Sequence, residues 1–134
     1  MSPSDLLRLV VIWAESTPFV SGVALVGSHA RGDAGPDSDI DLVILCSNPA
    51  ELFDGQWISE IGESSTPAIE DYGAVTSLRV YFANGPEVEF GLARKSWAQV
   101  PLDPGTQEVI ASGMRVLYDP EELLGTAQSE CGAY

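Results

Sequence analysis

Apolar residues recur along the chain with two different spacings, which separate the expected helices from the expected strands. Between Leu6 and Ala14 they recur at three- or four-residue intervals, as on the buried side of an amphipathic helix. The preceding Ser2-Pro3-Ser4-Asp5 offers a capping hydroxyl, a proline for the first turn and an early acidic side chain. A helix is therefore predicted here, bounded by Pro18.

Short continuous apolar runs that are rich in β-branched residues predict strands. Asn84-Gly85 separates two of these runs and is a strong hairpin signal, although Pro86 can lengthen the turn. The expected strands are residues 23–26, 40–46, 75–82, 87–93 and 115–118.

Further helix starts are expected where an Asn or Asp comes directly before a proline, at Asn48-Pro49, Asp103-Pro104 and Asp119-Pro120. Residues 54–74 are expected to form a helix or a lid-like loop. The order of elements predicts an α/β protein with a mixed β-sheet flanked by helices. With 134 residues, we expect a single domain over residues 1–128 and a disordered tail over 129–134.

The turn that follows the first apolar strand run is a candidate nucleotide-binding turn. Gly27 lets the backbone approach a phosphate closely, and Ser28 offers a hydroxyl and an amide. Arg31 is the nearest fixed positive charge and is a candidate for holding a triphosphate or the leaving pyrophosphate.

Asp39 and Asp41 flank Ile40 at the start of the next predicted strand. Because strand side chains alternate between two faces, the two carboxylates lie on one face, about 7 Å apart along the strand. Such carboxylates repel each other unless a cation lies between them, and oxygen-only ligands suit Mg²⁺. This pair is therefore a candidate magnesium site for a metal–nucleotide substrate.

A site for two metal ions usually needs a third carboxylate from a neighbouring strand. Glu87 and Glu89 share one face of the predicted strand 87–93, and Glu89 is preferred because it lies deeper in the apolar run. It would ligate the metal and accept the proton of an attacking hydroxyl. Glu87 stays open as the alternative.

Several polar residues here also have simpler explanations. Residues 37–41 can form a solvated strand entrance, and Glu89 can be an exposed strand residue. His29, the only histidine, is more readily explained as a loop residue than as part of a catalytic triad. Asp33 and Asp37 are expected to be loop acids.

The charge balance narrows the choice of partner. The chain has 20 acidic and 6 basic residues and a net charge of −14, and Arg94-Lys95 is its only adjacent basic pair. Binding to nucleic acid or to an anionic membrane is therefore not expected, whereas a cationic small molecule or a basic partner protein is favoured. Two cysteines and no secretory signal fit a cytoplasmic location.

These residues resemble the nucleotidyltransferase superfamily that includes DNA polymerase beta. Its pattern of Gly-Ser, a loop, Asp-x-Asp and a third carboxylate is matched by Gly27-Ser28, Asp39-Ile40-Asp41 and Glu89. The stretch from Gly27 to Leu42 is especially similar to minimal and antibiotic nucleotidyltransferases. The resemblance extends over Val23–Ala93, and it departs from the family in having Glu where Asp is common.

The resemblance implies transfer of a nucleoside monophosphate from a nucleoside triphosphate to a hydroxyl, with release of pyrophosphate. It implies that Gly27 and Ser28 bind the phosphates. Two Mg²⁺ ions would be held by Asp39, Asp41 and Glu89. Because only about 40 residues follow the hairpin strand, the acceptor is expected in a small cleft, across a homodimer or on a partner protein.

Three functions are therefore considered. The first is a Mg²⁺-dependent nucleotidyltransferase, binding ATP or another nucleoside triphosphate, that modifies a hydroxyl of a small molecule or a partner protein. The second is an antitoxin-type minimal nucleotidyltransferase that adenylylates a helical toxin partner. The third is a non-catalytic nucleotide-binding or interaction module. The acceptor and the preferred base stay open.

Overall fold

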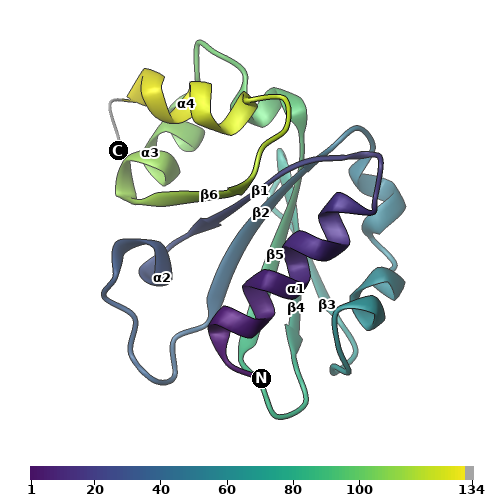
Figure 1. Cartoon of the computed structure of the whole chain (residues 1–134). Helices are drawn as coiled ribbons and strands as arrows, with labels where there is room; N and C mark the ends of the chain where they lie inside the picture. Colours follow the sequence, from purple (N-terminus) through teal and green to yellow (C-terminus); the bar gives the residue numbers. More distant parts are fainter. Residues whose placement is uncertain (132–134) are drawn as a thin grey trace.

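A six-stranded β-sheet forms the centre of the computed structural model, which describes residues 1–131 (Figure 1). Its strands, in the order β3-β4-β5-β2-β1-β6, are β1 (Val20–Val26), β2 (Ile40–Cys46), β3 (Ala68–Asp71), β4 (Val75–Tyr81), β5 (Glu87–Arg94) and β6 (Met114–Tyr118). The helices are α1 (Pro3–Glu15), α2 (Ser28–Arg31), α3 (Pro104–Ser112) and α4 (Leu123–Cys131), with short 3₁₀ helices η1 (Pro49–Leu52), η2 (Gln56–Glu60) and η3 (Lys95–Ala98).

The sheet is mixed, which confirms the expected fold class. Strands β2 and β5 pair in parallel, while every other neighbouring pair in this sheet is antiparallel. The parallel pair needs a long connection, and η1, η2, β3 and β4 supply it. Asp41 consequently faces Val26 of β1 on one side and Glu89 of β5 on the other.

Helix starts follow the local sequence. Ser2 and Asp5 form a reciprocal capping box at α1, and the Asp103 carboxylate accepts the Thr106 backbone N–H at α3. The last helix begins later than expected, because the Asp119 side chain caps it by accepting the backbone N–H groups of Leu124 and Gly125.

Within residues 1–131, every helix is too short or too polar to span a lipid bilayer.

Two segments differ from the sequence-based expectation. Residues 54–74 contain η2 and then β3, a strand that was not predicted because all four of its residues are exposed and show no apolar alternation. The expected disordered tail starts at Ser129, but residues 129–131 form the last turn of α4. The rest of that segment, 132–134, lies outside the described residues.

Apolar clusters lie on both faces of the sheet, and Figure 1 shows the two groups of helices that pack against them. On one face, α1, η1 and η2 pack on alternate residues of β2, namely Ile40, Leu42 and Ile44. On the other face, α3, α4 and η3 pack on Val43 and Leu45.

This second face is covered by apolar side chains only over part of its width. Its apolar cluster draws on β1, β2, β6 and the end of β5. Toward β4, the same face carries polar side chains. Leu78 and Phe90 point to the opposite face, into the apolar cluster under α1, η1 and η2 (the first core), so the residues next to them in sequence point away from that core. A polar, partly open area results, bearing Ser77, Arg79 and Glu89.

An aromatic cluster fixes the segment between β2 and β3 against the first core. Trp57 stacks on Trp13 with ring centroids 4.5 Å apart and meets Phe90 edge-on at 4.9 Å. Its indole Nε1 donates a hydrogen bond of 2.8 Å to the carbonyl oxygen of Leu52. Trp57 therefore links α1, η1, η2 and β5.

Replacement of Trp57 by Ala is expected to lower the free energy of unfolding by about 3–5 kcal/mol, because it removes a buried aromatic side chain. Trp57→Phe keeps the ring contacts but loses the hydrogen bond, so its cost should be about 1–2 kcal/mol. Ile12→Ala on the exposed side of α1 is the control, with a change of about 0.5 kcal/mol. Urea unfolding measures all three, and equal costs at Trp57 and Ile12 would contradict this role.

Candidate active site

Three carboxylates meet on the open part of the second sheet face. Asp41 is the second residue of β2 and lies opposite Glu89 in the parallel register with β5. Asp39 precedes β2 by one residue. One oxygen of each of Asp39, Asp41 and Glu89 lies within 4.8 Å of the other two. The residues selected from the sequence are therefore brought into one cluster.

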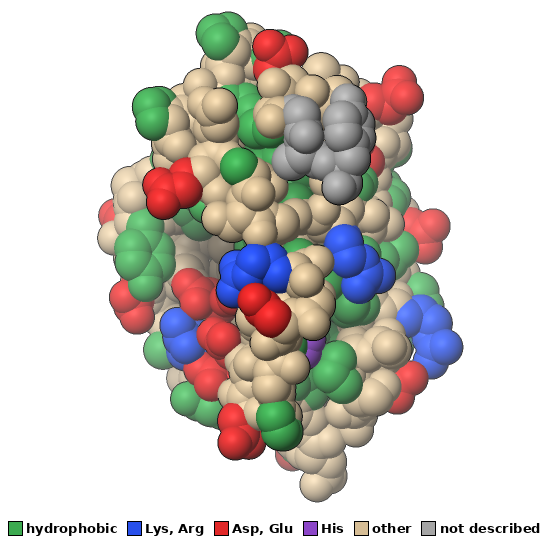
Figure 2. Space-filling view, turned by 90° about the vertical axis from the view of Figure 1, so that its left-hand side faces the viewer, with side chains coloured by type: hydrophobic (Ala, Val, Ile, Leu, Met, Phe, Trp, Pro, Cys, Tyr) green, Lys and Arg blue, Asp and Glu red, His purple; other side chains and the backbone are tan. Residues whose placement is uncertain are grey.

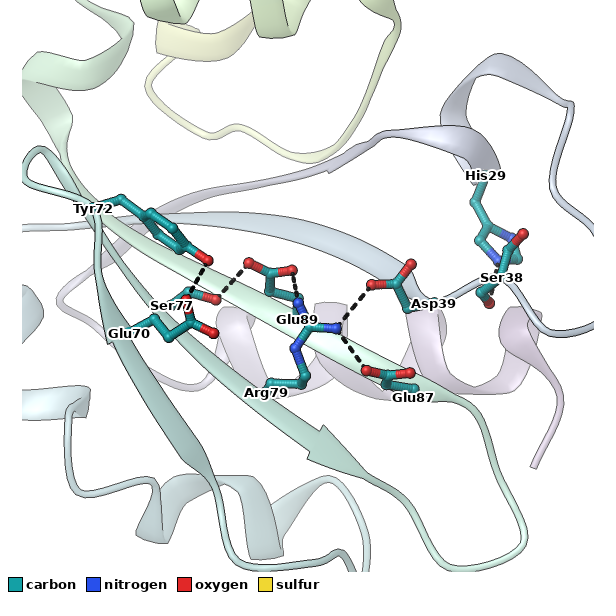
Figure 3. A network of polar contacts seen from close by, with 9 residues as sticks. All are labelled: His29, Ser38, Asp39, Glu70, Tyr72, Ser77, Arg79, Glu87 and Glu89. Atoms are coloured by element: carbon teal, nitrogen blue, oxygen red, sulfur yellow. Dashed lines mark hydrogen bonds and ion pairs between the residues drawn. The ribbon is translucent and has the colours of Figure 1, made fainter.

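The guanidinium of Arg79 lies between the carboxylates of Asp39, Glu87 and Glu89 (Figure 3). Arg79 of β4 is the antiparallel register partner of Glu89. Its Nη2 donates to Glu89 Oε2 at 2.8 Å, while its Nη1 donates to Glu87 Oε2 at 2.6 Å and to Asp39 Oδ2 at 3.4 Å. A single cation thus offsets part of the charge of three carboxylates, and these carboxylates raise the pKa of Arg79.

Both oxygens of Glu89 are engaged. Its Oε1 accepts a hydrogen bond of 2.7 Å from the Ser77 hydroxyl, and its Oε2 accepts the bond from Arg79. The two donors, both on β4, hold the Glu89 carboxylate in a defined orientation beside Asp41.

Asp41 carries the electrostatic cost of this cluster. Burial, followed by the neighbouring charges of Asp39 and Glu89, raises the pKa of Asp41 to about 6. Within residues 1–131, no side-chain hydrogen bond reaches this carboxylate to offset its burial. A cation bound at the cluster would relieve this repulsion.

The glycine turn lies directly against Asp41. Gly27 has φ 73° and ψ −155°, a conformation that is essentially restricted to glycine. A Cβ atom at this position would lie 2.5 Å from Asp41 Oδ2. The carbonyl oxygen of Gly27 accepts the backbone N–H groups of Ala30 and Arg31, so Ser28 is the first residue of α2.

An open cleft of about 230 Å³ borders Asp41 and Glu89. Figure 2 shows a hollow on this side of the molecule with acidic side chains gathered beside it. Apart from those two carboxylates and Ser77, the cleft is lined mainly by apolar and aromatic side chains, including Val26, Val43, Tyr72, Val75, Trp97 and Val109. It offers an apolar surface next to the charged cluster.

The site lies inside a segment that matches a known protein family. The family model described as a nucleotidyltransferase domain matches residues 8–94, from α1 to the end of β5. The chain belongs to the nucleotidyltransferase domain family. This confirms the resemblance drawn from the Gly-Ser and Asp-x-Asp motifs. None of the curated proteins matches the sequence.

Solved structures are similar to this nucleotidyltransferase domain at low sequence identity. An aminoglycoside 6-adenyltransferase from Bacillus subtilis is 12% identical with a TM-score of 0.52, over 71% of this chain and 35% of that one. Cid1 poly(U) polymerase with Mg and 3′-dATP bound is 16% identical (TM-score 0.49), over 66% of this chain and 29% of that one. A toxin–antitoxin structure with AMP-PNP is 11% identical (TM-score 0.49), over 93% and 82%. This chain spans about a third of the first two, and the likeness to the Bacillus subtilis protein shows the fold.

The remaining candidates in the nucleotidyltransferase domain lie around the cluster. Arg31 is the last residue of α2, and its exposed Nε pairs with Asp33 Oδ2 at 3.2 Å, outside the carboxylate cluster. His29 Nε2 lies 3.3 Å from the carbonyl oxygen of Ser38, so it joins the two ends of the loop between α2 and β2. Glu87 contacts Arg79 and does not belong to the group of three carboxylates.

Sequence reasoning missed Arg79 and Ser77. Both lie on the strand predicted for residues 75–82, where a polar residue at every second position indicates a solvent-facing side. The hairpin turn at Asn84-Gly85 sets Arg79 opposite Glu89. A two-residue turn at Asn84-Gly85 would have paired Arg79 with Phe90, whereas the longer turn of the structure pairs Tyr81 with Glu87 and Arg79 with Glu89. The available signal was therefore the polar pattern of the strand and not the register.

Replacement of Gly27 by Ala is expected to lower the free energy of unfolding by about 2–4 kcal/mol, because backbone strain adds to the clash with Asp41. The matched control is Gly32→Ala, which has φ 82° but no atom within 4 Å of the added Cβ. Its cost should be about 1 kcal/mol.

A double-mutant cycle separates the clash from the strain. In an Asp41→Ala background, the cost of Gly27→Ala should fall by at least about 1 kcal/mol, because the blocking carboxylate is gone. Urea unfolding of the four proteins gives this coupling. An unchanged cost of Gly27→Ala in the two backgrounds would show that the turn and Asp41 do not touch.

Asp41→Asn is expected to stabilise the metal-free protein at pH 8. The folded-state pKa of about 6 lies above the ordinary value of 3.8, so the folded state holds this proton more tightly and loses stability as the pH rises through that window. The gain at pH 8 should be about 1–2 kcal/mol after allowance for solvent screening, and it should vanish near pH 4.

Unfolding in EDTA-containing buffer at both pH values tests this, with Asp37→Asn in the exposed loop as the control. A gain that is the same at pH 4 and pH 8 would contradict a raised pKa at Asp41.

Proposed function

We propose that this chain is a Mg²⁺-dependent nucleotidyltransferase that moves a nucleoside monophosphate from a nucleoside triphosphate to a hydroxyl group and releases pyrophosphate. The observation that carries the proposal is the convergence of Asp39, Asp41 and Glu89 within 4.8 Å, on an open sheet face against the Gly27 turn. Family membership supports the reaction class.

The donor set suits a hard cation. Asp39, Asp41 and Glu89 offer only carboxylate oxygens, which Mg²⁺ prefers, and their mutual repulsion favours an incoming cation. These three residues would hold the two Mg²⁺ ions that we propose. When bound, Mg²⁺ neutralises phosphate oxygens and stabilises the charge that develops on the leaving group.

The glycine turn would bind the phosphates. Gly27 leaves no side chain in the way, and Ser28 presents its hydroxyl and backbone amide directly after the turn. Arg31 lies one turn further on, in an exposed position where its side chain is 42% accessible. We assign Arg31 to the leaving pyrophosphate, where its positive charge would offset the charge of the product.

Glu89 has two proposed roles with different requirements. As a metal ligand it offers carboxylate oxygens that already accept hydrogen bonds from Ser77 and Arg79. As a base for the acceptor hydroxyl it needs one of these oxygens free of its donor. We therefore assign Glu89 first as a ligand, and as a proton acceptor only once Arg79 releases it.

The acceptor would bind in the cleft beside the carboxylates. The apolar lining of the cleft, which includes Tyr72 and Trp97, suits the apolar part of an acceptor. The net charge of −14 favours an acceptor that is a cationic molecule or a basic protein. A small-molecule hydroxyl, a side chain of a helical toxin-like partner and a site completed across a homodimer are the acceptor arrangements to compare. For all three arrangements, we propose that the protein is located in the cytoplasm.

Thermal unfolding with ATP, GTP, CTP or UTP, each with and without Mg²⁺, tests the nucleotide site. A nucleotide at a hundred times its dissociation constant should stabilise the fold by about 2.7 kcal/mol. The midpoint should rise by roughly 5–15 °C in the wild type and in Asp37→Asn, but not in Asp41→Asn. No shift with any nucleotide would overturn the proposal.

Transfer is tested separately with α-labelled nucleotide and a panel of hydroxylated cations and candidate partner proteins. Label on an acceptor, lost in Asp39→Asn and Asp41→Asn, is the expected result. Mg²⁺-dependent nucleotide binding without transfer to any acceptor would instead favour the non-catalytic binding module.

A further inference from the structure

We propose that Arg79 is a built-in counter-cation of the active site, which competes with the divalent metal for Asp39 and Glu89, and that Glu87 retains it when the metal binds. The inference rests on the proposed function, since it assumes that these carboxylates are the metal ligands. It assigns roles to two residues that belong to neither the nucleotide turn nor the cluster of three carboxylates.

Arg79 occupies oxygens that a metal would need. It donates to Glu89 Oε2 at 2.8 Å and to Asp39 Oδ2 at 3.4 Å, so two of the three clustered carboxylates are shared with it. A guanidinium carries one positive charge and only hydrogen-bond donors, whereas a divalent cation carries two charges and can bind oxygens of all three carboxylates. The guanidinium and the metal therefore exclude each other from these oxygens.

Glu87 supplies a resting position outside the cluster. Its Oε2 accepts the shortest of the arginine's three contacts, 2.6 Å from Nη1, the same nitrogen that reaches Asp39 at 3.4 Å. Glu87 and Glu89 lie on the same face of β5, two residues apart. The guanidinium can therefore leave Asp39 and Glu89 while its bond to Glu87 persists.

The surroundings of Arg79 permit this shift. Its side chain is 36% exposed and lies on the open face of β4, so a change of rotamer does not disturb either apolar core. The antiparallel register fixes its backbone opposite Glu89, which keeps the side chain within reach of both glutamates.

The competition predicts opposite effects on stability and on metal affinity. Without Arg79, four carboxylates crowd one face of the sheet with no cation among them, so the metal-free fold is weakened. The same change leaves the metal ligands free, so the metal binds more tightly. An arginine that only stabilises the fold would not improve metal binding when it is removed.

The first test is Mn²⁺ binding in the absence of nucleotide, followed by the paramagnetic resonance signal of the free ion. Arg79→Gln should bind Mn²⁺ about tenfold more tightly than the wild type. Its metal-free unfolding midpoint should be lower. The matched control is Arg94→Gln at the far end of β5, which removes the same charge and should leave the affinity within about twofold.

Glu87→Gln should weaken Mn²⁺ binding by about threefold or more, because Arg79 then rests on Asp39 and Glu89 alone. Its matched control is Glu70→Gln on β3, which removes an acid that bonds to Tyr72 and not to Arg79. Unchanged or weaker binding in Arg79→Gln, or equal effects at Glu87 and Glu70, would overturn the proposal.

A second measurement uses the wild type, so that it does not depend on a variant that folds. With ¹⁵N-labelled arginine, Mg²⁺ titration should shift the guanidinium resonances of Arg79 but not those of Arg94. A titration that binds Mg²⁺ without moving Arg79 would overturn this inference and leave the proposed function intact. No metal binding by the wild type or by Arg79→Gln would overturn both.

Discussion

Strand β2 lies in the interior of the sheet, and its parallel register with β5 sets Asp41 directly opposite Glu89. The same pairing aligns Ile40, Leu42 and Ile44 with the apolar residues of β5, so one register both builds the core and assembles the carboxylates. A shift by one residue would turn Asp41 into the core and Ile40 to the open face. Burial of the apolar residues therefore protects the geometry of the site.

Carboxylates that repel one another are gathered on a sheet face that the helices leave partly open. Asp39, Asp41, Glu87 and Glu89 share that face, and Arg79 is the cation that contacts three of them. Asp41 has no such contact, and the raised pKa of its carboxyl reflects both its burial and the neighbouring carboxylates. Complete coverage by a helix would make this arrangement far more costly, because charges without water need complete pairing. The incomplete layer on this face thus lowers the cost of gathering four carboxylates in one place.

Gly27 meets two requirements, one on the backbone angles of the turn and one on the space beside the Asp41 carboxylate. The backbone angles there strongly favour glycine, and the missing Cβ leaves room for the Asp41 carboxylate. The loop that follows is tied back by the contact of His29 with Ser38, which sets the approach to Asp39. The turn and the acidic pair, separated by a loop in sequence, therefore form one unit in the structure.

The amino-acid sequence by itself determined most of the helices and strands and the two motifs. Apolar periodicity predicted α1, a continuous apolar run predicted β2, and Asn84-Gly85 between two such runs predicted the β4–β5 hairpin. The Gly27-Ser28 and Asp39-Ile40-Asp41 motifs indicated the family, because these signals depend on neighbours in the chain. The exposed strand β3 has no such local signal. Only the tertiary structure decided that Glu89, and not Glu87, joins the aspartates, and that Arg79 lies among them. Those relations depend on strand order and register, which arise from contacts between residues far apart in sequence.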